Sequence, residues 1–145
     1  MKKLFIAALI MVAAGTSAFA ADVKVNTKVQ TSFESLFSGA ENVSWSAKDH
    51  YIKASFILSQ ENVEAYFGTD GELIGTSRKI ELKNLPLSAV QKIKKEYASY
   101  KITDSIEFER AGERSYYVSL ENGNKKQILE VSLFGTVSTF RSEKK

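Results

Sequence analysis

The chain has 145 residues, 43% of them hydrophobic and 26% charged, with one His and no Cys. This length corresponds to one ordinary domain. The absence of cysteine excludes a disulfide scaffold, a thiolate metal site and a cysteine nucleophile. The formal net charge is +3, but without the first twenty residues the chain carries 18 basic and 17 acidic side chains. This nearly neutral body gives little electrostatic basis for nucleic-acid binding.

The first twenty residues have the order of a secretory signal peptide. Lys2 and Lys3 precede an apolar run over residues 4–14, and small residues close the segment, so we predict cleavage between Ala20 and Ala21. The apolar run is shorter than the roughly 20 residues that span a bilayer. We therefore expect an exported protein, periplasmic or secreted, with no stable membrane insertion after cleavage.

An amphipathic helix is predicted after a flexible tether at residues 21–26. Thr27 with Gln30 is expected to cap the start of this helix, and Gly39 marks its end. The apolar residues that follow recur at helical spacing, which predicts one buried side. They are Val29, Phe33, Leu36, Phe37 and Ala40.

The apolar period then changes to two, which predicts antiparallel strands. A short strand over residues 43–48 carries Trp45, whose parity places it on the core side. Later in this half, Asp70 and Gly71 supply the positive φ angles of a tight turn. A strand over residues 72–80 follows that turn.

Between these strands lies a predicted hairpin whose register has two alternatives. A two-residue loop sets Phe56 opposite Ala65, whereas a four-residue loop sets Phe56 opposite Phe67. Both alternatives place the same alternating residues on the core face, because the side-chain period of a strand is two.

The second half begins at Leu85-Pro86, where proline suits a first helical turn. Val90, Ile93 and Tyr97 then lie on one helical face. The last strand is predicted over residues 136–141, and the polar tail 142–145 is expected to fray. Turns are predicted at Ala111-Gly112, Asn122-Gly123 and Phe134-Gly135. The residues expected on the core face of the intervening strands are Ile102, Ile106, Phe108, Tyr116, Val118, Leu120, Leu129, Val131 and Leu133.

The two halves have the same predicted order, one helix followed by about four strands in a meander. We therefore predict an α+β fold, a single domain over residues 27–141 built from similar units at 27–80 and 86–141. One helix per unit covers one face of the antiparallel sheet, which leaves the other face open. That open face is where we expect function to lie.

No catalytic constellation is found in the sequence. His50 is the only histidine and is interpreted as an exposed turn residue, whereas a metal site needs several converging ligands. A serine hydrolase needs a base beside its nucleophile, and His50 would have to serve alone in that role. No glycine-rich nucleotide-binding motif is present either. We therefore predict a non-enzymatic protein without a cofactor.

Glu107 and Glu109 are the candidate exception. Two acids at this spacing share one face of a strand at about 7 Å, which is compatible with an acid/base pair or a weak cation site. The alternative is that they keep an exposed strand soluble. A small enzyme or cation-dependent protein would use this pair.

Strand alternation places three tyrosines on the face opposite the core. Tyrosine and arginine often dominate the energy of protein contacts, although tyrosine is also a common exposed strand former. The predicted partner-binding residues are Tyr51, Lys53, Tyr66, Tyr117 and Glu130, with Arg78 expected nearby.

A wider set of residues, spread from Thr27 to Phe140, carries a family resemblance: Phe33-x-x-x-Phe37, Ala40-x-x-Val43-x-Trp45, Tyr51, Phe56, Ala65-x-Phe67, Asp70-Gly71, Leu85-Pro86, Val90-x-x-Ile93-x-x-x-Tyr97 and Tyr116-Tyr117. Together they resemble the PepSY-like, or beta-lactamase-inhibitor-like, family of small exported bacterial proteins. The resemblance implies helix-plus-antiparallel-sheet units, which in the beta-lactamase inhibitor itself present a concave sheet to a partner enzyme.

This chain departs from the family pattern at two points. Family members frequently have proline after the phenylalanine that ends the first helix, where this chain has Ser38. The secreted inhibitor is stapled by disulfides, and this chain has no cysteine. We therefore carry over no inhibitory residue.

The sequence thus predicts an exported, non-enzymatic binding module that holds a protein or peptide partner on its open sheet face. The alternative is an inhibitor or modulator of an exported hydrolase or protease. The partner expected in either case is an exported protein or peptide, not a nucleic acid.

Overall fold

The computed structural model describes residues 24–48 and 50–144, with side chains described as far as Ser142. The predicted signal peptide, its cleavage site between Ala20 and Ala21, and residues 21–23 of the predicted tether lie outside the described residues. Within the described part, none of the helices combines the length and the apolar character that a membrane span requires.

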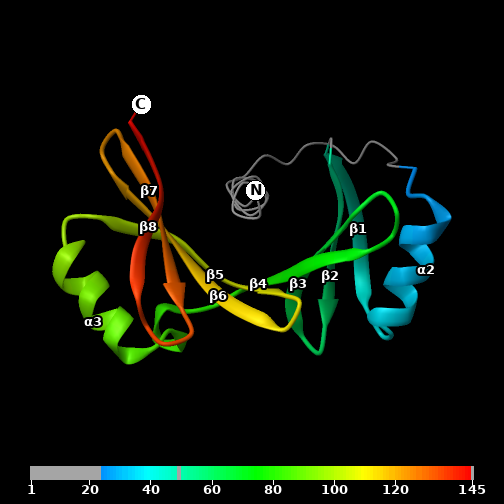
Figure 1. Ribbon diagram of the computed structural model, residues 1–145, viewed down its shortest axis with the longest axis horizontal. Coiled ribbons are helices and arrows are strands. Elements are labelled where there is room, and N and C mark those ends of the chain that lie inside the picture. Colours follow the sequence, from blue (N-terminus) through cyan, green and yellow to red (C-terminus); the bar gives the residue numbers. More distant parts are fainter. Residues whose placement is uncertain (1–23, 49, 145) are drawn as a thin grey trace.

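The architecture is one eight-stranded antiparallel sheet with two α-helices (Figure 1). The strand order in the sheet follows the chain order from β1 to β8, which confirms the predicted meander. The first half contains α2 (Thr27–Leu36), β1 (Glu41–Lys48), β2 (Tyr51–Leu58), β3 (Glu61–Phe67) and β4 (Leu73–Lys79). After the short 3-10 helix η2 (Leu82–Asn84), the second half contains α3 (Leu87–Glu96), β5 (Lys101–Arg110), β6 (Glu113–Asn122), β7 (Lys125–Ser132) and β8 (Val137–Lys144).

The two helices cover the same face of the sheet at its opposite ends, as Figure 1 shows. The register across the strands carries this face from one half to the other, because Val63 pairs with Arg78, Arg78 with Glu107, and Glu107 with Tyr116. Val63 packs in the core under α2, and Tyr116 packs in the core under α3. Both cores therefore lie on the helix side of one continuous sheet.

The core under α2 is largely aromatic. Phe33 lies 5.0 Å from Phe56 and 5.1 Å from Trp45 between ring centroids, in edge-to-face arrangements that aromatic pairs prefer. Ala54 and Ala65 face each other across β2 and β3 and are fully buried. This pair of small side chains leaves room for the helix. The core position predicted for Trp45 is confirmed.

Helix α2 is capped by Asn26 and not by the predicted Thr27 and Gln30 box. The Asn26 side chain accepts a hydrogen bond from Val29 N–H at 3.0 Å and donates one to Thr69 O at 2.9 Å. Asparagine is among the preferred capping residues. Asn26 therefore belongs to the fold and not to a tether.

The first hairpin has neither of the two predicted registers. Phe56 pairs with Val63, and Leu58 pairs with Glu61, so the loop is Ser59-Gln60. Both loop residues have positive φ, +51° and +69°, as a type I′ turn requires. The predicted core face is nevertheless correct, because the shift is an even number of residues.

The second half follows the same construction around α3. Ala89 and Ile93 of α3 are buried in the same cluster as Val118 and Leu129, while Pro86 is the residue just before the helix. The last strand is longer than predicted. Instead of fraying from Ser142, the backbone of β8 pairs with β7 as far as Lys144.

Two loops, one after the third strand of each half, share a hydrogen-bond pattern. In loop 68–72, Gly71 N–H donates to Gly68 O at 3.0 Å, and Gly68 N–H donates to Glu72 O at 2.8 Å. Loop 132–136 repeats both bonds at 2.9 Å between the corresponding positions. Gly71 and Gly135 have positive φ, whereas Asp70, which was predicted to share this conformation with Gly71, does not.

The halves are joined within the sheet by a short ladder between β4 and β5. The residues from Thr76 to Lys79 pair with those from Ile106 to Glu109, and Ile80 N–H donates to Ser105 O at 3.0 Å. The neighbouring β5–β6 ladder runs from Lys101 to Arg110. The joint is therefore a narrow strip of backbone hydrogen bonds.

Candidate functional site

The sheet face opposite both helices, called here the open face, holds all five predicted partner-binding residues. Lys53 pairs with Tyr66 across β2 and β3, and Tyr117 pairs with Glu130 across β6 and β7. Tyr51 lies two residues before Lys53 and shares its face. The structure therefore brings these side chains to one surface, although their role in binding a partner stays a prediction.

An uninterrupted series of aromatic rings crosses the open face. We call it the aromatic row. Its neighbouring ring centroids are 5.7, 6.2, 6.5 and 5.2 Å apart, within the range for favourable aromatic contacts. Its members, from β2, β3, β5, β6 and β8, are Tyr51, Tyr66, Phe108, Tyr117 and Phe140. The row therefore spans both halves of the chain.

The row depends on a reversal of alternation in β5 that the sequence did not predict. Ile102 pairs with Leu120 on the helix side, but a bulge before Asp104 shifts the register. Ile106 consequently pairs with Tyr117 on the open face, and Phe108 lies on that face too. Ile106 and Phe108 are buried, as predicted for core residues, but they lie on the face opposite the helices, because a bulge adds one residue to the period.

Gly75 keeps the row continuous where it crosses β4. A Cβ atom at this position would lie 2.8 Å from Cζ of Phe108 and 2.7 Å from the carbonyl oxygen of Glu109. The missing side chain lets the Phe108 ring lie over β4 and reach Tyr66. Neither Gly75 nor Phe108 was predicted to contribute to this face.

A polar network lies beside the row in the first half. Lys53 Nζ donates to Glu64 Oε1 at 2.7 Å, and Tyr66 Oη donates to Glu64 Oε2 at 2.7 Å. Ser77 Oγ lies 3.2 Å from Tyr66 Oη and completes the network. Glu64 was missed, although its parity with Tyr66 in β3 would have placed it on this face.

The network holds one positive and one negative charge in contact. Burial alone would raise the pKa of Glu64, but hydrogen bonds from Lys53 and Tyr66, with the Lys53 charge, lower it below its ordinary value. Burial, followed by the nearby Glu64 charge, raises the pKa of Tyr66. The carboxylate therefore stays ionised and the phenol stays protonated at neutral pH.

Tyr51 brings an unused hydrogen-bond donor to the open face. Its side chain is 6% exposed, and its buried hydroxyl has no hydrogen-bond partner among the described residues. Burial, followed by the Glu64 charge, raises the pKa of Tyr51 and keeps its proton in place. Because an unsatisfied buried hydroxyl costs about 1–3 kcal/mol, a hydrogen-bond acceptor supplied from outside would be favourable there.

The second half has its own hydroxyl and carboxylate pair. Tyr117 Oη donates to Glu130 Oε1 at 3.2 Å across β6 and β7. Burial, followed by the Glu130 charge, raises the pKa of Tyr117. Each half thus fixes a row tyrosine with a carboxylate from the same face.

Arg78, Glu107 and Glu109 lie on the helix side, away from the tyrosines. Arg78 was expected near the tyrosines, but it pairs with Val63 and binds Glu107 at 3.0 Å. Arg114 binds Glu109 at 3.2 Å. The two acids share a face as predicted, but arginines neutralise both, which opposes capture of a cation.

The remaining candidate for chemistry is His50, and it lies exposed in a turn, as interpreted. In the ranges 24–48 and 50–144, no three His, Cys, Asp or Glu side chains converge in a way that could hold a metal ion.

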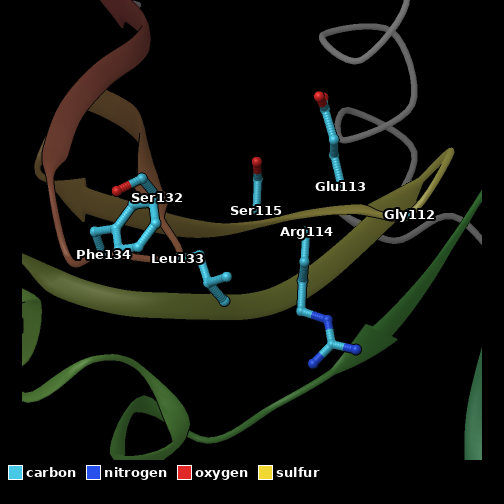
Figure 2. Close-up of a pocket in the computed structure, with 7 residues that line it drawn as sticks. All are labelled: Gly112, Glu113, Arg114, Ser115, Ser132, Leu133 and Phe134. Atoms are coloured by element: carbon cyan, nitrogen blue, oxygen red, sulfur yellow. The ribbon is translucent and has the colours of Figure 1, made fainter.

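A hollow lies at the rim of the sheet, between the turn that joins β5 to β6 and the turn that joins β7 to β8 (Figure 2). Leu133 was predicted on the core face, but it is 52% exposed because β7 ends at Ser132 and the chain turns away. Phe134 was used only as a turn signal and is 90% exposed. The lining residues are Gly112, Glu113, Arg114, Ser115, Ser132, Leu133 and Phe134.

The strand order and helix placement define an α+β protein with two helices on one side of an eight-stranded antiparallel sheet. This is the fold of BLIP-like proteins. A BLIP-like protein from Bacteroides fragilis superposes with a TM-score of 0.69 at 20% identity, covering 82% of this chain and 85% of that one. A DUF2874 family protein from Bacteroides uniformis gives a TM-score of 0.71 at 14% identity, covering 82% and 88%.

A proposed periplasmic protein from Bacteroides eggerthii is also similar, with a TM-score of 0.72 at 14% identity and coverage of 83% and 88%. None of these three proteins is described as an enzyme. No family model and no curated protein matches the sequence. Similarity at these identities establishes the fold and leaves the activity to be argued from the site.

Proposed function

We propose that this protein is an exported, non-enzymatic binding module that holds a protein or peptide partner on its open face. The aromatic row carries this proposal. Five ring side chains from five strands form a continuous, largely buried row on the sheet face that neither helix covers. Similarity to a BLIP-like protein and to a proposed periplasmic protein supports export and a binding role.

The electrostatics of the open face favour a partner with polar groups over a purely apolar one. Glu64 and Glu130 orient two row tyrosines through their hydroxyls. The Tyr51 hydroxyl lacks an acceptor within the described chain, but it is buried, so a partner would reach it only after the neighbouring side chains move. A peptide backbone supplies carbonyl acceptors of the required kind, and aromatic side chains add contact area at low cost in conformational entropy.

We further propose that the chain belongs to the PepSY-like family and arose by duplication of a unit that corresponds to residues 27–80 and 86–141. The common order of one helix and four strands supports this origin. The matching hydrogen bonds of loops 68–72 and 132–136 support it independently, because element order alone does not dictate loop geometry.

A capture experiment tests the open face with matched substitutions. Ser46 and Ser138 lie on this face, opposite Lys53 and Glu130, while their neighbours Ala47 and Thr139 lie on the helix side. Ser46→Arg and Ser138→Arg should abolish capture of specific proteins from an exported fraction. Ala47→Arg and Thr139→Arg should leave that capture unchanged. Equal capture by all four variants would contradict the proposal.

The second candidate function is inhibition or modulation of an exported hydrolase or protease. The observation that favours it is similarity to a BLIP-like protein. The mature chain should then slow at least one enzyme in a panel of exported beta-lactamases and proteases, and Ser46→Arg should relieve the effect. No slowing across the panel would count against this candidate.

A further inference from the structure

The hollow at the rim contains a short length of strand that has no neighbour on one side. The β6–β7 ladder begins with the pair Ser115 and Ser132. Glu113 and Arg114 precede this pair and are matched only by β5, through Arg110 and Glu109. In the described part of the chain, β6 therefore presents a two-residue edge toward the hollow. Unpaired strand edges bind extended chains.

Apolar side chains stand beside this edge on a fixed loop. Phe134 is 90% exposed and Leu133 is 52% exposed. A Cβ atom at Gly135, whose φ is +84°, would lie 3.1 Å from Cβ of Pro86, so the loop lies close to the start of α3. Thr136 N–H also donates to Ser132 Oγ at 3.1 Å. The loop therefore holds Phe134 in place, and a partner would bind it at a low entropic cost.

The geometry of the loop does not require these apolar residues. Loop 68–72 has the same hydrogen bonds but carries Thr69 and Asp70 at the positions of Leu133 and Phe134. Asp70 Oδ1 accepts a hydrogen bond from Glu72 N–H at 3.0 Å and so supports its own turn. The exposed phenylalanine is thus peculiar to the second loop, and structural need does not explain it.

The charge of the hollow comes from Glu113. Figure 2 shows Glu113 and Ser115 on one side of β6 and Arg114 on the other. Arg114 is neutralised by Glu107 and Glu109. Glu113 is exposed, and within the described residues 24–48 and 50–142 no ion pair to it is found. An occupant with a basic side chain would complement this carboxylate.

We propose that this hollow binds an extended peptide segment in which an apolar residue stands next to a basic one. The backbone of the segment adds to the edge at Glu113 and Arg114, its apolar side chain packs on Phe134, and its basic side chain pairs with Glu113. This contact lies at the rim of the sheet, away from the aromatic row, although Glu113 shares the face of Tyr117, and it does not rest on the function proposed above.

The test uses the mature chain and a synthetic probe, the acetylated and amidated hexapeptide Thr-Val-Lys-Leu-Thr-Val. We expect its addition to shift backbone amide resonances at residues 112–115 and 132–134. A version methylated on its backbone nitrogens should cause no such shifts, because it cannot pair with a strand edge. No shifts in this region, or equal shifts with the methylated peptide, would overturn the proposal.

Matched variants separate the parts of the contact. Phe134→Ser should weaken binding roughly tenfold, as loss of a central aromatic contact does. Leu36 was predicted on the buried side of the first helix but is 54% exposed on α2, far from the hollow, so Leu36→Ser should leave binding unchanged. Glu113→Gln should weaken binding of the lysine peptide but not of its glutamine version. Unchanged affinity in Phe134→Ser would overturn the assignment. Ser46→Arg changes the open face in β1, at the other end of the sheet, and should have no effect on peptide binding in the hollow.

Discussion

Phe108 packs directly over Gly75, on a site where any other residue would place a Cβ atom 2.8 Å from the phenylalanine ring. This relationship joins the two halves of the open face, because Phe108 comes from the first strand of the second half and Gly75 from the last strand of the first. Without it, the rings of Tyr66 and Phe108 could not approach to 6.2 Å.

Gly75→Ala should therefore destabilise the protein. Overpacking of a fitted core costs about 1–3 kcal/mol, and the backbone oxygen of Glu109 can yield less than a side chain. Urea unfolding of wild type and variant measures the change. The double variant Gly75→Ala, Phe108→Leu should recover part of the loss, because the shorter side chain relieves one of the two contacts. If the free-energy changes of Gly75→Ala and Phe108→Leu simply add in the double variant, Phe108 does not press on position 75.

Glu64→Gln should change how stability depends on pH. The fold lowers the pKa of Glu64 below 4.5, so the ionised carboxylate stabilises the native state above the unfolded pKa. That contribution is lost as pH falls through the folded pKa. The difference in unfolding free energy between wild type and variant should thus be constant near neutrality and shrink below about pH 4.5. A difference that grows on acidification would contradict the ion pair with Lys53.

Tyr66 and Tyr117 should resist ionisation in alkali. Both have a pKa raised above 10, by burial and then by a neighbouring carboxylate. Their protonated forms stabilise the fold up to the unfolded pKa, and this stability is lost as pH rises further. Ultraviolet titration should show that Tyr66→Phe and Tyr117→Phe leave tyrosinate absorbance unchanged near pH 10, before unfolding. A fall in absorbance at that pH would show an accessible phenol.

Asn26→Ala should lower stability by about 1 kcal/mol, the usual cost of losing a helix cap. The variant also loses the bond from Asn26 to Thr69, which ties the start of α2 to loop 68–72. Thr27→Ala is the matched control and should have a smaller effect, because its side chain does not cap the helix. Thermal unfolding measures both. An equal effect of the two substitutions would restore the predicted Thr27 cap.

Local patterns sufficed for much of this fold. The stripes through Phe33 and Ile93 predicted both helices, and glycines at 71 and 135 predicted the turns that follow β3 and β7. Period-two alternation also put Tyr51 and Tyr117 on the face away from the helices. These features depend on one residue and its near neighbours, so a sequence records them directly.

What escaped prediction depends on partners far away in the chain or on unusual backbone. The bulge after Ile102 moved Phe108 to the open face without any glycine to mark it. Ser59 and Gln60 form a left-handed turn without glycine, so the hairpin register was misjudged. Glu64 was not singled out in the sequence, because only the pairing of β2 with β3 brings it to Lys53.

The ladder between β4 and β5 is short, with Thr76 to Lys79 as its whole contribution from one side. Among the described residues, this strip and the bond from Ile80 N–H to Ser105 O link the halves through the backbone, so we expect the strip to govern the angle between the two ends of the sheet. Substitutions at Thr76 or Lys79 should alter the span between the ends while leaving the aromatic row unchanged. Changes in this strip would thus alter the width of the partner that the sheet accepts, whereas changes in the open-face side chains would alter the chemistry of that partner.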